Sequence, residues 1–470
     1  MVQLLLSLLS MRVMTWALSS SEVGNVYLIL SLASYFSLIF LSPVGLYMTR
    51  RLHAWHQERI LPDCYSRYNL YVLVVSIMAV PAIYAVKALF SFGGGIPTAP
   101  LLCAVAAFIY FGTWNSTFIP ALNILNYRRP FVLFSTLTLL FSLGFSLLLV
   151  ISVAKTALLW IAGQITGLLL LSGAAYFYFR DHIWGQASSQ RQTAAAAGLS
   201  MPAVYKFSFP LLITALFMWL QNQSYRIIVE RNLGSEFLGL MAVGLGIAIS
   251  IGAALESMMQ QIYYPIYYKA INTDNQEQRR RAWQRMSAVM LPMYLLAMIF
   301  VSFMSGHLAI VLVDAKFRAA AFFTVFGAWM EFARIATNML SNVAHSEMRT
   351  NYLAKPYIYG GVISVAGVLA GTSSPGYRYA VPAAMVFGAL STLLLMLFSM
   401  RRIMPLNISR GGLKLALLLS LPMPAALFFP AEDFSIRGSL LVLAVFSSYL
   451  AGAQYFLYKY AVPGPMETAA

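Results

Sequence analysis

The chain has 470 residues, of which 60% are hydrophobic and only 10% are charged, and its mean hydropathy is +0.74. Because soluble proteins carry about a quarter charged residues, this composition excludes a soluble globular protein and predicts an all-α integral membrane protein. The net charge of +16 does not by itself indicate a nucleic-acid partner, since in a membrane protein basic residues mark the loops of one side.

Fourteen apolar runs are close to the length that crosses a bilayer as a helix. They cover approximately residues 2–19, 25–48, 69–90, 101–120, 131–153, 157–179, 207–229, 237–262, 288–312, 320–342, 356–373, 379–400, 413–430 and 438–458. The first run could alternatively be a signal peptide. However, no Lys or Arg precedes its apolar stretch, and another span follows almost at once.

The basic residues of the loops are distributed unevenly between the two sides. If the N-terminus is inside, 21 of the 31 Lys and Arg residues fall in inner loops and the tail, and 6 fall in outer loops. The other four lie within or at the ends of spans: Arg12, Lys87, Arg226 and Arg334. The positive-inside rule therefore predicts that both termini are cytoplasmic.

An internal repeat links the two halves of the chain. In MRVMTWALSSSEVG, an arginine is followed by the pair Ser21 and Glu22, and the second copy, YRIIVERNLGSEFLG, keeps the same spacing 214 positions later. Both copies begin on the same side of the membrane, which predicts a parallel repeat of two six-helix lobes. Two further helices follow the second lobe.

These observations predict a domain organisation of four parts. The N-lobe covers 1–180, a cytoplasmic connector 181–206, the C-lobe 207–400, and the last two spans with the tail 401–470. The sequence has no GxxxxGK[ST] loop, so a gradient rather than ATP is expected to drive any transport.

Residues for redox, metal or cofactor chemistry are sparse. Two cysteines exclude a four-cysteine metal site or a disulfide framework, and no cofactor is predicted. The HAWH sequence at 53–56 lacks the acidic partner of a helical zinc site, and the alternative is a solvated basic loop.

The two repeat starts carry a family resemblance. They read SLLSMRVMTWALSSSEVGNVYLILSLASYF and YKFSFPLLITALFMWLQNQSYRIIVERNLGSEFLGLMAVGLGIA. The chain resembles the Wzx-type polysaccharide and O-antigen flippases of the MOP superfamily, relatives of MATE exporters and lipid II flippases. The Pro-Leu-Leu opening at Pro210, Arg226 and Gly239 fit this family, whereas Tyr225 stands where the family often has Asp. This departure puts in doubt a role for an Asp–Arg pair in coupling.

The resemblance implies a MATE-like fold and a flippase of the bacterial inner membrane. Such a protein carries a polyprenyl-diphosphate-linked oligosaccharide from the cytoplasmic to the periplasmic leaflet by alternating access. Its expected partners are this lipid-linked oligosaccharide, membrane lipids and a polysaccharide polymerase machinery, and nucleic acid is not expected. A diphosphate crossing hydrocarbon needs a wet cavity with cations, and arginine can donate two parallel hydrogen bonds to phosphate.

Four arginines are candidates for substrate binding: Arg12, Arg50, Arg226 and Arg334. Arg12 and Arg226 occupy equivalent places in the repeat, and their alternative role is to snorkel to the lipid headgroups. Arg50 lies at the cytoplasmic end of the second span, where it could instead serve as a topology anchor.

Glu256 and Glu331 are candidates for ion coupling, since an ionisable residue inside a span is a functional hypothesis by default. Glu331 lies three residues before Arg334 on one helix face, and the alternative is a purely structural ion pair. Glu256 has no cation near it in sequence, and the alternative for it is solvation at the membrane interface.

Two rival functions remain open. One is a MATE-like, cation-coupled exporter of small organic molecules, which would favour carboxylates and aromatic residues in its cavity. The other is a membrane glycan polymerase or ligase, which would need a large extracytoplasmic loop with catalytic residues. Because no such loop is predicted, no catalytic residue is proposed and the chain is not expected to be an enzyme.

Overall fold

The computed structural model describes residues 2–184, 201–271 and 275–461. Throughout these ranges the regular structure is helical and contains no β-strand, which confirms the predicted all-α class. Among the described residues, thirteen helical stretches are long and apolar enough to cross a membrane. The chain is therefore a multi-pass membrane protein.

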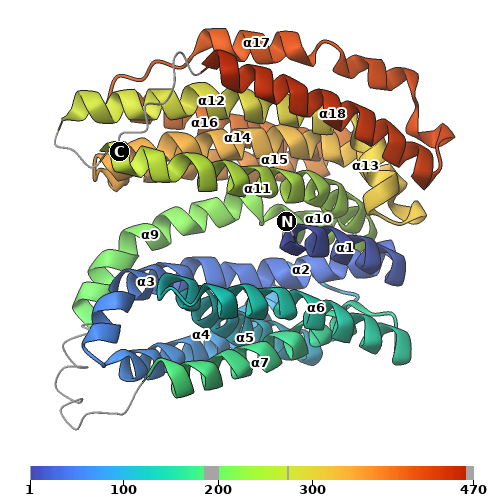
Figure 1. Cartoon of the computed structure of the whole chain (residues 1–470). Helices are drawn as coiled ribbons and strands as arrows, with labels where there is room; N and C mark the ends of the chain where they lie inside the picture. Colours follow the sequence, from blue (N-terminus) through green and yellow to red (C-terminus); the bar gives the residue numbers. More distant parts are fainter. Residues whose placement is uncertain (1, 185–200, 272–274, 462–470) are drawn as a thin grey trace. The chain divides into compact units, whose positions relative to one another are not determined.

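The chain divides into two compact units, Met1–Gly239 and Leu240–Ala470. Unit 1 is coloured blue to green in Figure 1. Its helices are α1 (Val2–Ala17), α2 (Ser20–Phe36), η1 (Ser37–Leu41), α3 (Ser42–Gln57), α4 (Leu61–Phe90), α5 (Thr98–Ile124), α6 (Arg128–Ser152), α7 (Ala157–His182), α9 (Met201–Asn222) and α10 (Tyr225–Leu233). The first five residues of α11 (Ser235–Ile271) also belong to unit 1.

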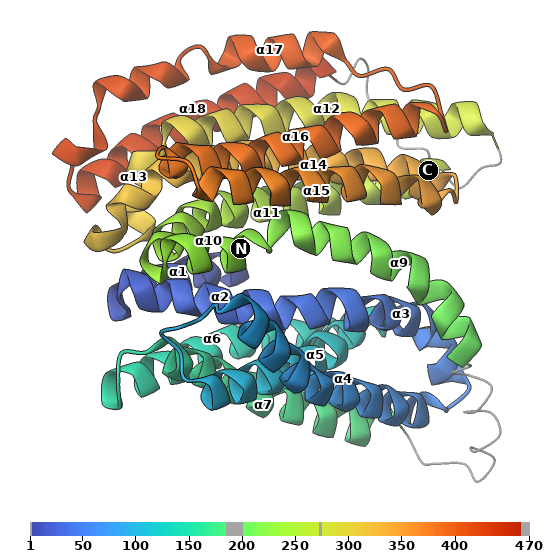
Figure 2. The same ribbon diagram turned by 180° about the vertical axis from the view of Figure 1, so that it is seen from behind.

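Unit 2 contains the rest of α11 and the helices that follow it (Figure 2). These are α12 (Gln276–Phe303), α13 (Ser305–Leu312), η2 (Ala315–Ala320), α14 (Ala321–Ser346), η3 (Thr350–Leu353), α15 (Ala354–Thr372), α16 (Tyr377–Arg401), α17 (Arg410–Ser420), η4 (Met423–Phe428), η5 (Ala431–Asp433) and α18 (Ile436–Ala461).

The fourteen expected spans agree with these helices in order and differ from them in detail. The span expected at 413–430 consists of α17 and, after a turn, the 3-10 helix η4. α1 has 16 residues and is shorter than a full span. The span expected at 207–229 is divided after Asn222, where Gln, Asn and Ser side chains compete with helical hydrogen bonds and Ser224 Oγ donates to the Leu220 carbonyl. The span expected at 288–312 is divided at Met304, between α12 and α13.

The second span contains a π-helical turn, η1, in its middle. Pro43 follows η1 at the start of α3. Because proline has no N–H and its ring crowds the carbonyl four residues earlier, a helix widens or kinks before it. The hydroxyl of Tyr71 on α4 donates to the Phe40 carbonyl at 2.9 Å, which satisfies a backbone oxygen of this turn.

The boundary between the predicted lobes remains a prediction. Most of the expected connector 181–206 lies outside the described residues, as does most of the C-terminal tail. The described part of the seventh span, α9, packs against α3 and η1 within unit 1.

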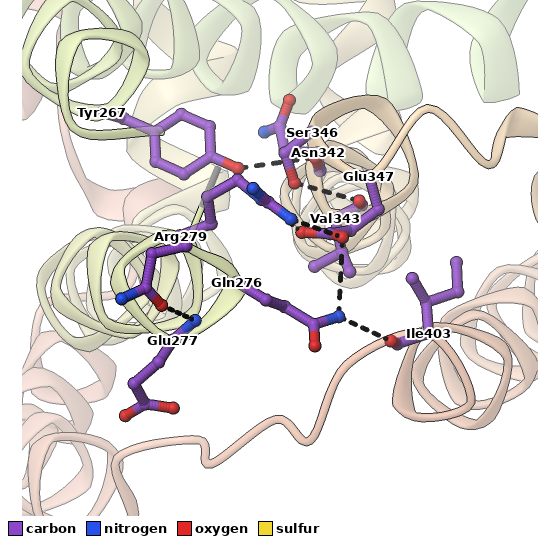
Figure 3. Close-up of polar contacts among 10 residues, drawn as sticks. Tyr267, Gln276, Glu277, Arg279, Asn342, Val343, Ser346, Glu347 and Ile403 are labelled. Carbon is purple, nitrogen blue, oxygen red and sulfur yellow. Dashed lines mark hydrogen bonds and ion pairs between the residues drawn. The ribbon is translucent and has the colours of Figure 1, made fainter. Parts of the chain in front are cut away.

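α12 forms the core of unit 2 and is buried along almost all of its apolar length. It contacts α14, α17 and α18, and Trp283 donates from its indole nitrogen to the Met339 carbonyl at 3.0 Å. Polar contacts fix the first turn of α12, as Figure 3 shows. Arg279 donates from two nitrogens to the Glu347 carboxylate at 2.7 and 3.0 Å, and Gln276 donates to the Ile403 carbonyl at 3.4 Å.

Candidate functional site

A cluster of three charged side chains connects α11 to α14 inside unit 2. The Arg334 guanidinium contacts two carboxylates, with Nη2 2.7 Å from Glu256 Oε2 and 2.8 Å from Glu331 Oε2. Its Nε also donates to both oxygens of Glu331, at 3.1 and 2.9 Å. The side chains of Glu331 and Glu256 are only 4% and 12% exposed. The ion pair anticipated from sequence is therefore present, and it gains a second carboxylate from another helix.

Neutral polar groups complete the surroundings of the two carboxylates. Asn338 Nδ2 and Gln260 Nε2 donate to Glu256 Oε1 at 3.1 and 3.3 Å. Gly252 makes room for Glu331, since a Cβ atom at this position would lie 2.9 Å from its Oε2. The sequence shows Asn338 four residues after Arg334, a helical spacing that could have indicated a shared face.

The charge balance of this cluster differs from the sequence-based expectation. Arg334 was a candidate for binding an anionic substrate, but two carboxylates surround it and leave one negative charge in excess. Glu256, for which interfacial solvation was the alternative, is instead buried and paired. A site with this balance favours a cation or a proton over an anion.

Arg226 lies on α10 in unit 1 and has different neighbours. Its guanidinium carbon lies 5.0 Å from the ring centre of Tyr27 and 5.7 Å from that of Tyr225. Nη1 donates to the Tyr27 carbonyl at 3.4 Å and Nε to the Tyr225 hydroxyl at 3.3 Å. Within the described ranges no carboxylate pairs with Arg226. Among the described residues, its charge is therefore stabilised by aromatic rings, a backbone carbonyl and a tyrosine hydroxyl.

Two acidic residues of the same unit bind backbone N–H groups instead. Glu230 on α10 accepts a hydrogen bond from the Gly93 N–H at 2.8 Å. Glu22 on α2 accepts one from the Ala157 N–H, at the N-terminus of α7, at 2.5 Å. An anion at a helix N-terminus is stabilised by the helix dipole. These carboxylates thus hold a loop and a helix end in place.

The two copies of the repeat meet at the N-terminal ends of α2 and α11. The hydroxyls of Ser21 and Ser235 are 2.6 Å apart, and Ser20 Oγ donates to Glu236 Oε1 at 3.3 Å. A Cβ atom at Gly24 would overlap the Ser235 carbonyl oxygen, and a Cβ at Gly239 would overlap that of Ser20. The glycines let two backbones approach closely, as small residues do in membrane helices.

The two other candidate arginines lie elsewhere in unit 1. Arg12 is half-buried on α1. Arg50 is exposed on α3, with its guanidinium 4.9 Å from the ring centre of Phe207 on α9. The structure thus places the four candidate arginines on four helices, and Arg334 belongs to unit 2.

A metal centre has no support in the described ranges, where no group of three or more His, Cys, Asp or Glu side chains could hold an ion. The buried His307 uses both ring nitrogens for structural contacts. Nδ1 lies 3.2 Å from Ser439 Oγ on α18, and Nε2 lies 2.9 Å from the Phe429 carbonyl.

Comparisons with known proteins agree with this architecture. Residues 183–321 match the model of a family described as polysaccharide biosynthesis protein. No curated protein sequence matches the chain.

Similar solved structures include lipid II flippase MurJ in an inward closed conformation, with a TM-score of 0.61 and 13% identity over 97% of each chain. An inward-facing MATE-family multidrug resistance transporter of the MOP superfamily is similar with a TM-score of 0.59 and 12% identity, over 85% of this chain and 94% of that chain. A MOP superfamily transporter from Pyrococcus furiosus, described as having a binding pocket of reverse polarity, is similar with a TM-score of 0.53. Its identity is 11%, over 88% of this chain and 93% of that chain.

The fold is thus that of MOP superfamily transporters, and part of the chain matches a polysaccharide-biosynthesis family. Together these findings confirm the resemblance to Wzx-like flippases of the MOP superfamily.

Proposed function

We propose that this protein is a flippase that moves a polyprenyl-diphosphate-linked oligosaccharide from the cytoplasmic to the periplasmic leaflet of a bacterial inner membrane. Alternating access between two lobes is the proposed mechanism, with both termini in the cytoplasm. The family match indicates polysaccharide biosynthesis, and the fold resembles that of a lipid flippase. The observation that carries the proposal within this chain is Arg226, a part-buried arginine that forms no ion pair with any carboxylate in the described part of the chain.

The surroundings of Arg226 suit a phosphate ligand. Its hydrogen bonds to Tyr27 and Tyr225 are long, at 3.4 and 3.3 Å, so exchanging them for phosphate oxygens costs little. Aromatic rings hold the planar guanidinium without neutralising it, and a charge-assisted bond to phosphate is about twice as strong as a neutral one. Arg12 and Arg50 remain proposed as further cations along the path. Arg334 is a weaker candidate because of its two carboxylates.

Glu256 and Glu331 remain proposed for ion coupling. Their excess negative charge would be balanced by a proton or a small cation, and the charge state of a buried network can bias two conformations. The coupling ion and a polymerase partner stay predictions.

A transport assay with matched variants tests the proposal. Purified protein is reconstituted into vesicles with a polyprenyl-diphosphate-linked oligosaccharide, and the sugar that reaches the other leaflet is measured with an enzyme added outside. We expect Arg226→Ala to lower the rate by about 10- to 100-fold, the value of one charged hydrogen bond. Arg226→Lys should retain intermediate activity.

Arg231→Ala serves as the control, because Arg231 is an exposed arginine on the same helix. Equal rates for the wild type and Arg226→Ala at equal protein density would remove Arg226 from the substrate path. No lipid transfer by any form of the protein would reject the flippase proposal.

A second candidate function, export of organic cations, is favoured by the excess carboxylate in unit 2 and the MATE-like fold. The same vesicles loaded with ethidium distinguish the two. Cation movement that is lost in Glu256→Gln, without lipid transfer, would support the exporter instead. Transfer of glycan to an acceptor by the purified protein would indicate an enzyme.

A further inference from the structure

A second candidate site lies wholly within unit 1, away from Arg226. It is a cavity of about 550 Å³ lined by residues of η1, α3, α4, α5 and α7. Figures 1 and 2 show these helices bundled together in the blue to green part of the chain. Pockets of this volume typically hold small organic ligands. One wall is formed by the π-helical turn, a feature that often accompanies functional sites.

The cavity wall combines apolar side chains with a row of hydroxyl groups and carries no formal charge. The described residues that line it include no Asp, Glu, Lys, Arg or His, whereas hydroxyl-bearing side chains come from several helices. They include Ser37, Ser42, Thr49, Thr113, Ser116 and Thr117. A diphosphate would find no cation here, so the cavity does not suit the charged part of a lipid-linked substrate.

The hydrogen bonds of these hydroxyls narrow the class of ligand further. Thr113, Thr117 and Ser116 each donate their single proton to a carbonyl of their own helix, at 2.6, 2.6 and 3.1 Å. The oxygens of Thr113 and Ser116 therefore remain as acceptors for a ligand that brings its own donors, whereas Thr117 also shares a hydrogen bond with Tyr68. Ser37 and Ser42 donate to no described residue and are free to act as donors. A ligand rich in hydroxyl groups matches such a wall.

A hydrocarbon chain has a better match elsewhere in unit 1. A separate groove of about 410 Å³ between α4 and α5 is lined almost entirely by apolar side chains, Leu73, Ile77, Met78 and Pro81 among them. The hydroxyl-lined cavity instead combines acceptors and donors with the rings of Tyr65, Tyr68 and Phe108. Aromatic faces pack well against the C–H surface of a sugar ring.

We propose that this cavity is a subsite for an uncharged sugar, one or two rings in size, of the lipid-linked glycan. The inference rests on the proposed function and adds to it a place where the glycan is recognised separately from the diphosphate. Sugar hydroxyls donate to the oxygens of Thr113 and Ser116. Ser37 in the π-helical turn and Ser42 at the start of α3 donate to the sugar.

Two kinds of variant test the subsite without disturbing the backbone. Gly112→Leu fills the cavity, because a Cβ at Gly112 would meet only the Phe108 ring, at 4.0 Å. Gly144→Leu on α6 is its control, since nothing lies within 4 Å of that position. The double variant Thr113→Val with Ser116→Ala removes two acceptors. Thr166→Val is its control, because Thr166 also donates to its own helix but lies outside the cavity.

The binding probes are two lipids, a polyprenyl diphosphate and the same lipid carrying an uncharged disaccharide, titrated onto full-length protein in detergent. The wild type should bind the sugar-bearing lipid more tightly. Gly112→Leu and the double variant should each lower the affinity for the sugar-bearing lipid about tenfold, the value of one or two neutral hydrogen bonds. Their affinity for the sugar-free lipid and their melting temperature should not change.

Arg226→Ala separates this inference from the proposed function. It should weaken binding of both lipids equally, because the diphosphate is common to them. If the cavity variants weaken binding of both lipids equally, the tail or the diphosphate occupies the cavity. If they weaken binding of neither lipid, the cavity has no role in binding. Either result overturns the subsite. If the wild type binds neither lipid, the flippase proposal fails and the subsite fails with it.

Discussion

The contacts that hold helices together within unit 1 differ in kind from those within unit 2. In unit 1, the start of α2 meets the first residues of α11 through paired serines and two glycines, with backbones in close contact. In unit 2, the middle of α11 is joined to α14 by an arginine between two carboxylates. The first contact depends on shape and the second on charge.

The same contrast separates two of the four arginines that the sequence offered as candidates for substrate binding. Arg226 lies on aromatic rings and a carbonyl, so its charge remains available to an anion. Arg334 is more than neutralised, and its removal would leave two buried carboxylates. An unpaired arginine is suited to bind substrate, whereas a paired one is suited to hold structure.

The largest expected effect is on unit 2. Arg334→Met should lower the free energy of unfolding by about 3 to 5 kcal/mol, because buried carboxylates lose their counter-charge. An SDS unfolding titration of the purified protein measures this. Glu277→Ala, which removes an exposed ion pair with Arg280 and Arg281, is the control and should unfold like the wild type. If Arg334→Met is as stable as the wild type, the charged network contributes little to the free energy of unfolding.

A smaller loss is expected at the glycine contact of unit 1. Gly239→Ala places a methyl group against the Ser20 carbonyl and should cost about 1 to 3 kcal/mol, as overpacking does. Gly144→Ala, with open space around it, should be neutral or slightly stabilising because alanine favours helix. The difference in unfolding free energy between the two variants is the measurement, and equal values would contradict the close approach.

The smallest stability change is expected when the Arg-to-Met substitution is made at Arg226 instead of Arg334. Arg226→Met should cost about 1 kcal/mol, because only cation–π contacts and weak hydrogen bonds are lost. Lipid transfer should nevertheless fall at least as far as in Arg226→Ala. If Arg226→Met destabilises the protein as much as Arg334→Met does, the distinction between the two arginines is wrong.

Most of the fold was predictable, because a bilayer imposes one strong rule on any chain. Each span must satisfy its own backbone hydrogen bonds over a fixed length, so apolar runs near twenty residues indicate helices. The interruptions were not predicted. Those at Asn222 and Met304 and the π-helical turn before Pro43 depend on local competition for backbone groups, which hydropathy does not register.

The site was predictable only where its residues share a helix. Glu331 and Arg334 lie three apart and were paired from sequence, and they are paired in the structure. Glu256 lies 78 residues before Arg334, and no periodicity connects them. The repeat spacing related Ser21 to Ser235, but it did not indicate that their hydroxyls would touch.

Composition and hydropathy by themselves determined that this protein is a helical, multi-pass membrane protein, because water-free surroundings leave a chain few alternatives. Only the tertiary structure decided which charges are neutralised, since that depends on the side chains that neighbouring helices present to one another. It gave Arg334 two carboxylates and surrounded Arg226 with aromatic rings, and it placed uncharged hydroxyls around a cavity in unit 1. Pairing of this kind is a property of helix packing, and a linear sequence does not contain it.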